Sequence, residues 1–423
     1  MSERRNNQRN RNSSNDRRNR QQPVYGQGPY GQGPYQQGGY NQGPYGQGAY
    51  NQGPYQQGAY GQRQRTPDPA GYYEDPQDRR GRNKKRKKKR RIIFAIEIIV
   101  LLLLAVGLFV AAKLGKVQKQ SISKDDIVIN QSISPEEQKV LEGYTNIALY
   151  GLDSREGKMD IESHSDALMI ASINNKTKDI KLVSVYRDTY LDNTNGEYRK
   201  ATECYYFGGP QRSMAMLNVN LDLDIQDFIT VDFNVLAEVV DELGGIEIDI
   251  AEDEIEHLNN YQVEGSQVTG KDIVPVTYAG PQTLNGLQTL SYCRIRYTEG
   301  SDYKRTERQR TVLDQILKKA KTTDLLTLNA IIDKVAGNVL TSLSTTEILS
   351  LAKDIASYNL VDTTGFPFEV QTANISAGDC VIPVNLEQNV LQLHQWMFGS
   401  DGYTPSDKVK EISNKIINET GIQ

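Results

Sequence analysis

The sequence predicts an α/β domain built on a partly parallel central sheet and covering about residues 141–400. Two observations predict this class. Short apolar runs of strand length, each ended by turn residues, alternate with longer segments that have helical spacing. A strand, a helix and a further strand also follow one another directly between residues 227 and 250. This order favours two parallel strands joined by a helix.

The strands expected in the sheet are short apolar runs. NIALYG ends in a glycine, which suits a buried strand followed by a loop, and the next two runs are joined by the turn-like NNKTK. The fourth run, DFITVDF, leads into NVLAEVVDEL, which has helical spacing and stops at Gly244-Gly245. GIEIDI then alternates as a strand. We expect the strands at 146–151, 167–173, 179–186, 227–233 and 245–250, and the helix at 234–243.

The remainder of the domain is expected to be mainly helical. Residues 251–282 are the exception, because they are polar and irregular, and we expect an excursion or flap there. The last helix is expected within a C-terminal tail at 401–423, where Ser406 is a suitable N-cap. The helices are expected at 284–292, 306–321, 325–335, 345–358 and 407–419.

The first 91 residues have the composition of a disordered tail. They contain 20 Lys+Arg, 6 Asp+Glu and almost no aliphatic side chains, and a five-residue unit of the type GQGPY repeats seven times from Gly26 to Tyr60. Such a segment buries too little apolar surface to offset its chain entropy. The regular tyrosines favour weak self-association, so the tail is expected to act either as a tether or as a plain spacer.

Residues 92–112 form a run of 21 residues with a single charge, which is long enough to cross a bilayer as one helix. The run follows the basic stretch NKKRKKKRR. Because positive flanks stay inside the cell, we expect residues 1–91 in the cytoplasm and the chain from residue 113 outside. Residues 113–140 are expected to form a juxtamembrane stalk between this span and the folded domain.

The arginines of the outer part are unevenly distributed. Residues 113–423 hold 29 Lys+Arg against 46 Asp+Glu, a net charge of −17, which argues against nucleic-acid binding. Five of the nine arginines in this part nevertheless fall within seventeen residues. A guanidinium fork matches phosphate or carboxylate oxygens, so we expect anion binding; a basic helix face paired with nearby acids is the plainer alternative. These five are Arg294, Arg296, Arg305, Arg308 and Arg310.

Further charged side chains lie at the expected strand ends. Asp153 lies in the loop after the first strand, and Arg187 and Asp188 follow the third. Asp166 precedes the second strand, so it shares this edge only if that strand runs antiparallel to the first. Ligands of open α/β sheets bind at the carboxyl ends of the strands. Each residue alone also fits a local cap or ion pair, and their combination is what favours a site.

Two Asp carboxylates near one another suit Mg²⁺, which takes few protein oxygens together with substrate phosphates. Nearby arginines then neutralise the remaining phosphate charge. Phosphoryl transfer needs little beyond positioning and electrostatic stabilisation, so the residue types at this edge predict chemistry at phosphorus.

Other chemistries lack support in the sequence. It contains no G-x-S-x-G, Walker A or H-E-x-x-H pattern. Of the histidines His164, His257 and His394, only the first is near the expected site, and the other two are expected on the surface or in packing. The spacing of the three cysteines does not match a metal site. Packing as buried thiols is favoured for each of them, and one disulfide between two of them remains an alternative. These are Cys204, Cys293 and Cys380.

Several stretches, in this order, resemble the LytR-CpsA-Psr family of membrane-anchored enzymes that attach glycopolymers to the Gram-positive cell wall. The resemblance covers Asn146 to Arg310 and continues more weakly to about Phe398. It rests on NIALYGLDSR, SDALMIASIN, VSVYRDTY, VDFNVLAEVVDELGGIEIDI, LNGLQTLSYCRIRY and DYKRTERQR.

The resemblance implies a three-layer α/β/α fold that holds a polyprenyl chain in an apolar tunnel, with the lipid pyrophosphate at its mouth together with Mg²⁺. A peptidoglycan hydroxyl attacks the phosphorus that bears the polymer, a phosphodiester forms and polyprenyl phosphate leaves. Partners would then be the lipid-linked glycopolymer, peptidoglycan, the membrane and, through the cytoplasmic tail, proteins of wall synthesis.

The resemblance also assigns residues by motif. The metal and pyrophosphate would be organised by Asp153 and Asp166. The phosphates would be clamped by Arg187, Arg294, Arg296 and Arg305. On a strand, Arg294 and Arg296 would share one face and act as a two-pronged clamp. Further substrate contacts would come from Arg155, Asp188, Asp302 and Arg308. Arg308 and Arg310 lie on the following helix, where a role behind the phosphate contacts or in the fold itself is favoured for both.

The chain departs from the family pattern at three places. His164 stands where the family often has Arg, and Lys304 where a Gly is common. The stretch KATECYYFGG at 200–209 follows the family's K-I-N-x-A-Y only loosely. His164 and Lys304 favour one alternative to the transferase, a scaffold that binds polyprenyl phosphates without turnover. A phosphatase that uses the same residues with water as acceptor also stays open.

Overall fold

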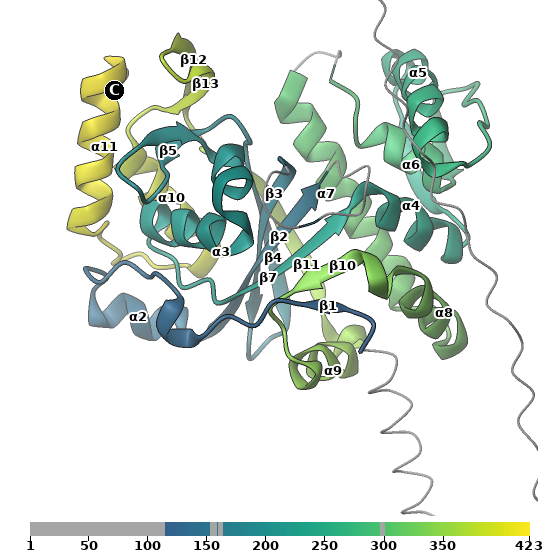
Figure 1. Ribbon diagram of the computed structural model, residues 1–423, viewed down its shortest axis with the longest axis horizontal. Helices are drawn as coiled ribbons and strands as arrows, with labels where there is room; N and C mark the ends of the chain where they lie inside the picture. Colours follow the sequence, from purple (N-terminus) through teal and green to yellow (C-terminus); the bar gives the residue numbers. More distant parts are fainter. Residues whose placement is uncertain (1–114, 153–158, 160–163, 297–300) are drawn as a thin grey trace, which may run out of the picture. The chain divides into compact units, whose positions relative to one another are not determined.

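The computed structural model describes residues 115–152, Met159, 164–296 and 301–423 (Figure 1). The predictions for the tail at 1–91 and for the membrane span at 92–112 lie outside these residues. Within the described part, none of the helices combines the length and the apolar character needed to span a membrane.

A mixed sheet forms the centre of the domain, as the sequence predicts, and it has seven strands among the described residues. In spatial order the strands are β1 (Gln118–Lys119), β10 (Val339–Thr341), β7 (Asp227–Asp232), β2 (Tyr144–Leu152), β3 (Ser165–Asn174), β4 (Asp179–Val185) and β11 (Asn359–Phe366). The pairs β1/β10, β7/β2 and β4/β11 are parallel, and the other neighbours are antiparallel. Four of the predicted strands, β2, β3, β4 and β7, form the middle of the sheet.

The parallel pairing expected after β7 does not form. Helix α4 (Phe233–Glu242) follows β7, but β8 (Ile246–Ile250) pairs with β9 (Gly280–Leu284) in a separate two-stranded sheet. Gly244 and Gly245 have φ angles of 73° and 87°, a left-handed conformation that turns the chain away from the central sheet. β8 also alternates buried and exposed residues, whereas a central parallel strand is buried on both faces.

The prediction of an irregular flap at 251–282 is wrong for residues Glu252–Thr269, because they form helix α5. The buried positions of α5 recur with helical spacing, but some of them are polar, so the sequence shows no apolar helical pattern there. Gln262 is satisfied there, since its amide donates to the Val274 carbonyl at 3.0 Å. The buried positions are Glu254, Leu258, Gln262 and Gly265.

Helices cover both faces of the sheet, which gives three layers (Figure 1). One face carries α2 (Pro135–Leu141), α3 (Ala201–Leu221), α10 (Leu386–Phe398) and α11 (Asp407–Thr420), with hairpins β5–β6 (Tyr190–Asp192, Tyr198–Lys200) and β12–β13 (Val370–Ile375, Gly378–Pro383). The other face carries α4, α5, α6 (Gly286–Tyr292), α7 (Ser301–Ala320), α8 (Leu325–Val335) and α9 (Thr345–Lys353). Short 3₁₀ turns lie at Lys124–Asp126, Ala336–Asn338 and Ile355–Ser357.

The folded domain is wider than the predicted 141–400. In the segment expected to be a stalk, the Asn130 amide donates to Asp222 at 2.6 Å and to Ser406 at 2.7 Å. The C-terminal tail is also part of the domain, because α11 buries an apolar side against the main core. Ser406 caps α11 as predicted, accepting from the backbone N–H of Val409 at 3.2 Å.

The cysteines and His394 have packing roles, as expected. All three cysteines are buried and free, and burial raises the pKa of the Cys293 thiol to about 12, so it is not a nucleophile at neutral pH. His394 is fully buried: Nδ1 lies 2.6 Å from a Glu137 carboxylate oxygen and Nε2 lies 2.8 Å from the Leu221 carbonyl. Its ring stacks on Tyr403.

Candidate functional site

The register of the sheet brings the predicted site residues to one edge. Leu152, the last residue of β2, pairs with Ser165 at the start of β3 and with Asp232 at the end of β7. β3 runs antiparallel to β2, which is the condition under which Asp166 reaches this edge. β4 runs antiparallel to β3, so Arg187 follows the end of β4 at the same edge.

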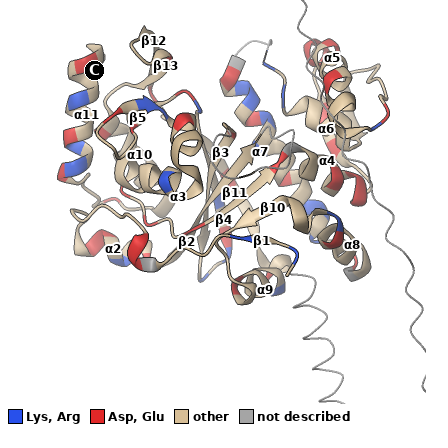
Figure 2. Ribbon diagram, in the orientation of Figure 1, with Lys and Arg blue, Asp and Glu red and all other residues tan. Residues whose placement is uncertain are grey.

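Three arginines and two aspartates meet at this edge. Arg187 forms an ion pair with Asp166. Arg296 lies 4.0 Å from both Asp166 and Asp302, and Arg305 pairs with Asp302 at 2.8 Å. Arg305 is only 3% exposed and also donates to the Asp166 carbonyl at 3.3 Å. Arg305 is thus the residue of α7 that contacts both aspartates, and it belongs to the basic residues that follow one another along this helix (Figure 2).

The carboxylates at the edge influence each other. Burial raises the pKa of Asp302 to about 6. Arg296 and Arg187 oppose this rise, while the negative charges of Asp188 and Asp166 add to it. Asp302 therefore titrates near the lower end of the physiological range, so the charge of the edge depends on pH.

Lys200 is a further basic residue at this edge, and sequence reasoning did not select it. Its ammonium lies 3.3 Å from the Asp188 carboxylate, which in turn lies 3.7 Å from Nε of Arg187. The only sequence signal was its place at the start of the stretch that follows the family pattern loosely.

Arg294 and Arg308 lie apart from the aspartate cluster. Residues 293 and 294 form a turn and residues 295 and 296 belong to no strand, so the two-pronged clamp of Arg294 and Arg296 does not form. Arg294 lies 3.1 Å from Glu264 of α5 and over the Tyr261 ring. The arginine side chains diverge because a turn does not place alternate residues on one face.

Arg308 joins α7 to α5 in the interior. Its Nε lies 2.6 Å from a Glu254 carboxylate oxygen, and its guanidinium donates to the Ile295 carbonyl at 3.1 Å. Both side chains of the ion pair are less than a tenth exposed. Arg310 is buried too, and burial lowers its pKa. This geometry indicates that Arg308 and Arg310 support the fold rather than contact a substrate.

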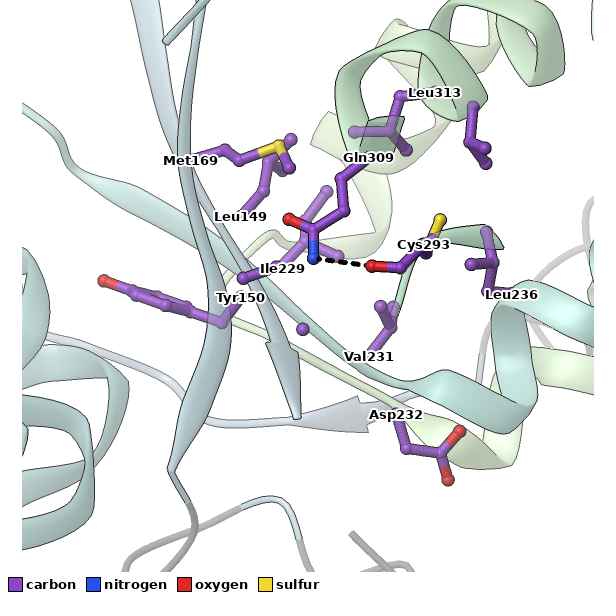
Figure 3. Close-up of a pocket in the computed structure, with 13 residues that line it drawn as sticks. Leu149, Tyr150, Met169, Ile229, Val231, Asp232, Leu236, Cys293, Gln309 and Leu313 are labelled. Atoms are coloured by element: carbon purple, nitrogen blue, oxygen red, sulfur yellow. Dashed lines mark hydrogen bonds between the residues drawn. The ribbon is translucent and has the colours of Figure 1, made fainter. Parts of the chain in front are cut away.

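An apolar cavity of about 210 Å³ opens between the sheet and α7 (Figure 3). Alternate residues of the middle strands line its floor, because successive side chains of a strand point to opposite faces. The side chain of Tyr150 points away from the cavity (Figure 3). The lining from β2, β3 and β7 includes Leu149, Gly151, Ala167, Met169, Ile229 and Val231, and the opposite wall comes from Leu236, Val312 and Leu313.

Gln309 is the polar side chain of α7 in this cavity, and the sequence did not single it out. It lies one turn after Arg305 and one turn before Leu313, so a charged, an amide and an apolar side chain follow one another along one side of the helix. Its amide donates to the Cys293 carbonyl at 3.5 Å (Figure 3). Its Oε1 is buried without a partner among the described residues.

Some predicted site residues cannot be placed. Asp153 and Arg155 lie outside the described residues. His164 is described; it is exposed, and its ring stacks on Tyr206 at 4.6 Å. Among the residues that the structure describes, no group of three or more His, Cys, Asp or Glu side chains is arranged to hold a metal.

Comparison with known proteins identifies the family. The model of the LytR_cpsA_psr family matches residues 108–392, which is more than half of the chain. The chain belongs to the LytR-CpsA-Psr family. The sequence resemblance is therefore confirmed, and it includes the strand ends and the arginine-rich segment described above.

Curated LytR-CpsA-Psr relatives are named as transferases. The chain is 28% identical over 230 residues to polyisoprenyl-teichoic acid–peptidoglycan teichoic acid transferase TagT of Bacillus subtilis, covering 53% of this chain and 69% of the relative. It is 31% identical over 220 residues to the transferase TagU of Enterococcus faecalis, covering 50% and 66%. A crystal structure from E. faecalis, described as a transcriptional regulator, superposes with a TM-score of 0.50 at 21% identity, covering 66% of this chain and 95% of that one, which supports the fold.

Proposed function

We propose that this protein transfers an anionic glycopolymer from a polyprenyl-pyrophosphate carrier to peptidoglycan through a phosphodiester bond. The observation that carries the proposal is the junction of two surfaces: an edge with Arg187, Arg296 and Arg305 lies beside an apolar cavity. A lipid pyrophosphate has the same two parts, an anionic head and an apolar tail. Membership of the family and the names of its curated relatives support the same activity.

The reaction follows from this arrangement. The arginines hold the pyrophosphate oxygens and neutralise charge that develops on the phosphoryl group. A hydroxyl of the peptidoglycan glycan attacks the phosphorus that bears the polymer. The bond from this phosphorus to the oxygen of the lipid-side phosphate breaks, and polyprenyl phosphate leaves with that electron pair. The hydroxyl proton passes to a nearby carboxylate, for which Asp302, with its pKa raised to about 6, is the candidate at the edge.

Mg²⁺ is the proposed cofactor, held by Asp166 and Asp153. The donor chemistry at the edge fits, because carboxylate oxygens are hard ligands and Mg²⁺ takes only one or two of them together with phosphate oxygens. Burial is the main cause of the raised pKa of Asp302, and the negative charges of Asp188 and Asp166, which add to it, are charges that a bound cation would offset. When bound, the ion would supply charge neutralisation at the pyrophosphate.

Residues 92–112 are proposed to anchor the protein, with the domain outside the cell and the basic tail inside. β1 begins at Gln118, only a few residues beyond the expected span, so the anchor would keep the domain close to the bilayer that holds its substrate. The tail is proposed to concentrate the protein at sites of wall synthesis. Deleting residues 21–65 is expected to disperse it, and an unchanged localisation would exclude this role.

The activity is tested with the full-length chain in lipid nanodiscs, a synthetic polyprenyl-pyrophosphate-linked sugar, Mg²⁺ and peptidoglycan oligomers. Mass spectrometry is expected to find a sugar phosphate joined to the oligomer. Arg187→Ala is expected to slow transfer by about 10²–10³-fold, as for loss of one preorganised donor. Arg187→Lys keeps the positive charge but lacks the planar guanidinium with its paired donors, so it is expected to recover only part of the transfer rate. Free sugar phosphate alone would indicate the phosphatase, and intact bound lipid the scaffold.

A further inference from the structure

A row of aromatic and cationic side chains lies at the start of α3 and on the segments that it contacts. His164 stacks on Tyr206, with ring centres 4.6 Å apart and planes 17° apart. Tyr206 meets Phe207 edge to face at 5.1 Å, and the guanidinium of Arg199 lies 5.3 Å from the centre of the Phe207 ring. These four residues are called the aromatic ledge. The transfer reaction described above assigns no role to them.

The ledge is fixed to the strand ends that carry the site. Thr202, in the first turn of α3, donates from its backbone N–H to the Arg187 carbonyl at 3.0 Å. Its hydroxyl donates to the Ser165 carbonyl at 2.9 Å. One turn later, α3 presents Tyr206 and Phe207. The ledge is therefore held next to the residues that flank Asp166 and Arg187, by bonds that are independent of the aromatic contacts.

The ledge is open to solvent, although three of its four side chains carry aromatic rings. Phe207 is 50% exposed, and His164 is exposed as well. Carboxylates stand close by, since Arg199 lies 3.0 Å from Glu197 and 3.4 Å from Glu203. An exposed ring face with hydrogen-bonding groups around it suits a sugar. The electron-rich face attracts the positively polarised C–H groups of a pyranose, and the charged groups bind its hydroxyls.

The position of the ledge selects which sugar binds. In phosphoryl transfer the attacking and leaving oxygens lie roughly in line through the phosphorus. The leaving group is polyprenyl phosphate, whose tail would occupy the cavity on the α7 face of the sheet. The acceptor must then approach from the other side. α3 packs on that other face, where the Tyr205 hydroxyl lies 3.1 Å from Thr230 of β7.

We propose that the aromatic ledge binds the acceptor, a glycan strand of N-acetylated amino sugars, and presents its hydroxyl to the phosphorus. This inference rests on the proposed transferase function. It also gives a role to Tyr206 and Phe207, which lie in the stretch where this chain departs from the family pattern.

The test uses the full-length chain in nanodiscs and measures transfer against the concentration of peptidoglycan oligomers. Phe207→Ala is expected to raise the KM for the oligomer about two- to twelvefold, the loss of one aromatic contact, while kcat at saturating oligomer stays near wild type. Phe207→Tyr keeps a ring and is expected to restore the KM. Tyr278→Ala removes an aromatic residue of similar exposure outside the ledge, 59% against 50% for Phe207, and is the matched control.

An unchanged KM for the oligomer in Phe207→Ala, or a rise only in the KM for the lipid donor, would overturn the proposal. A second measurement separates it from the transferase itself. Binding of the oligomer, without donor, is followed by saturation-transfer NMR. If the wild-type protein turns over no donor but binds the oligomer more tightly than Phe207→Ala does, the ledge is confirmed as a binding site and the transferase proposal is wrong. Equal binding by wild type and Phe207→Ala contradicts the ledge whether or not transfer occurs.

Discussion

The two faces of the central sheet are built from the same strands but are filled differently. Toward α3, the side chains of β2 and β3 are almost completely buried, with Tyr150 at 1%, Leu168 at 2% and Ile170 at 0% exposure. Toward α7, neighbouring residues such as Leu149 are only half-buried and line a cavity. Both faces are apolar, so hydrophobicity alone does not distinguish them. The α3 face stabilises the fold, whereas the α7 face leaves room for a ligand.

The arginines show the same division. Arg308 lies in the interior with a carboxylate partner, while Arg296 is 41% exposed at the edge and lies 4.0 Å from each of two aspartates. A short, buried ion pair maintains the packing of α7 against α5. Longer contacts at an open edge leave guanidinium groups able to turn toward phosphate. Buried pairs are therefore expected to govern stability, and the exposed arginines to govern ligand binding.

The largest expected effect on stability is at Arg308. Arg308→Ala leaves Glu254 buried without its charged partner, and we expect it to lower the free energy of unfolding by about 3–5 kcal/mol. Urea unfolding followed by circular dichroism measures this. The double variant Arg308→Met, Glu254→Leu is expected to recover much of the loss. A small effect of Arg308→Ala, comparable to that of Arg296→Ala, would remove the distinction between the two arginines.

Leucines on the two faces provide a matched pair. Leu168→Ala on the closed face is expected to cost about 2–5 kcal/mol, because it opens a cavity in a packed core. Leu149→Ala enlarges a space that already exists, and we expect it to cost about 1 kcal/mol, mainly through the lost transfer free energy of a half-buried side chain. Equal losses in denaturant unfolding would mean that the α7 face contributes to stability as the α3 face does.

The raised pKa of Asp302 predicts a smaller, pH-dependent effect on the free energy of unfolding. Its pKa rises from 3.8 to about 6 on folding, chiefly through burial, so the folded state binds a proton more tightly than the unfolded state does. The stabilisation from this proton is fully present below pH 3.8 and is lost as pH rises through about 6. In Asp302→Asn, the unfolding free energy is expected to decrease less than in the wild type between pH 3.8 and about 6. An unchanged pH profile would show that Asp302 is not desolvated as described.

The sequence predicted much of this domain. The middle strands have strong apolar patterns, and the residues that flank them were assigned to one edge because strand ends converge in an α/β sheet. Asp166 needed one further fact, the direction of β3, which a strand pattern does not contain. The place of β8 was missed because the conformation of two successive glycines, rather than apolar pattern, decides whether the chain returns to the sheet.

The missed features share a physical cause. α5 has a buried side made partly of polar residues, so its periodicity is hidden until the partners Val274 and Arg308 are known. Gln309 and Lys200 also act through neighbours that are distant in sequence. The roles of Arg294 and Arg296 diverged because a turn, rather than a strand, carries them. Local patterns predict elements, whereas these contacts depend on how elements pack.

The sheet edge that carries Arg187, Arg296 and Arg305 and the apolar cavity beside it are proposed to bind the head and the tail of one ligand. The most direct measurement is the affinity of the full-length chain for isoprenyl pyrophosphates of increasing length, by calorimetry below their micelle concentrations. Affinity is expected to increase with each added isoprene unit, since each buried CH₂ contributes about 0.8 kcal/mol, until the cavity is filled. Ala167→Phe, which fills the cavity, is expected to abolish this increase while inorganic pyrophosphate still binds. Affinity that does not depend on chain length in the wild-type protein would contradict the account.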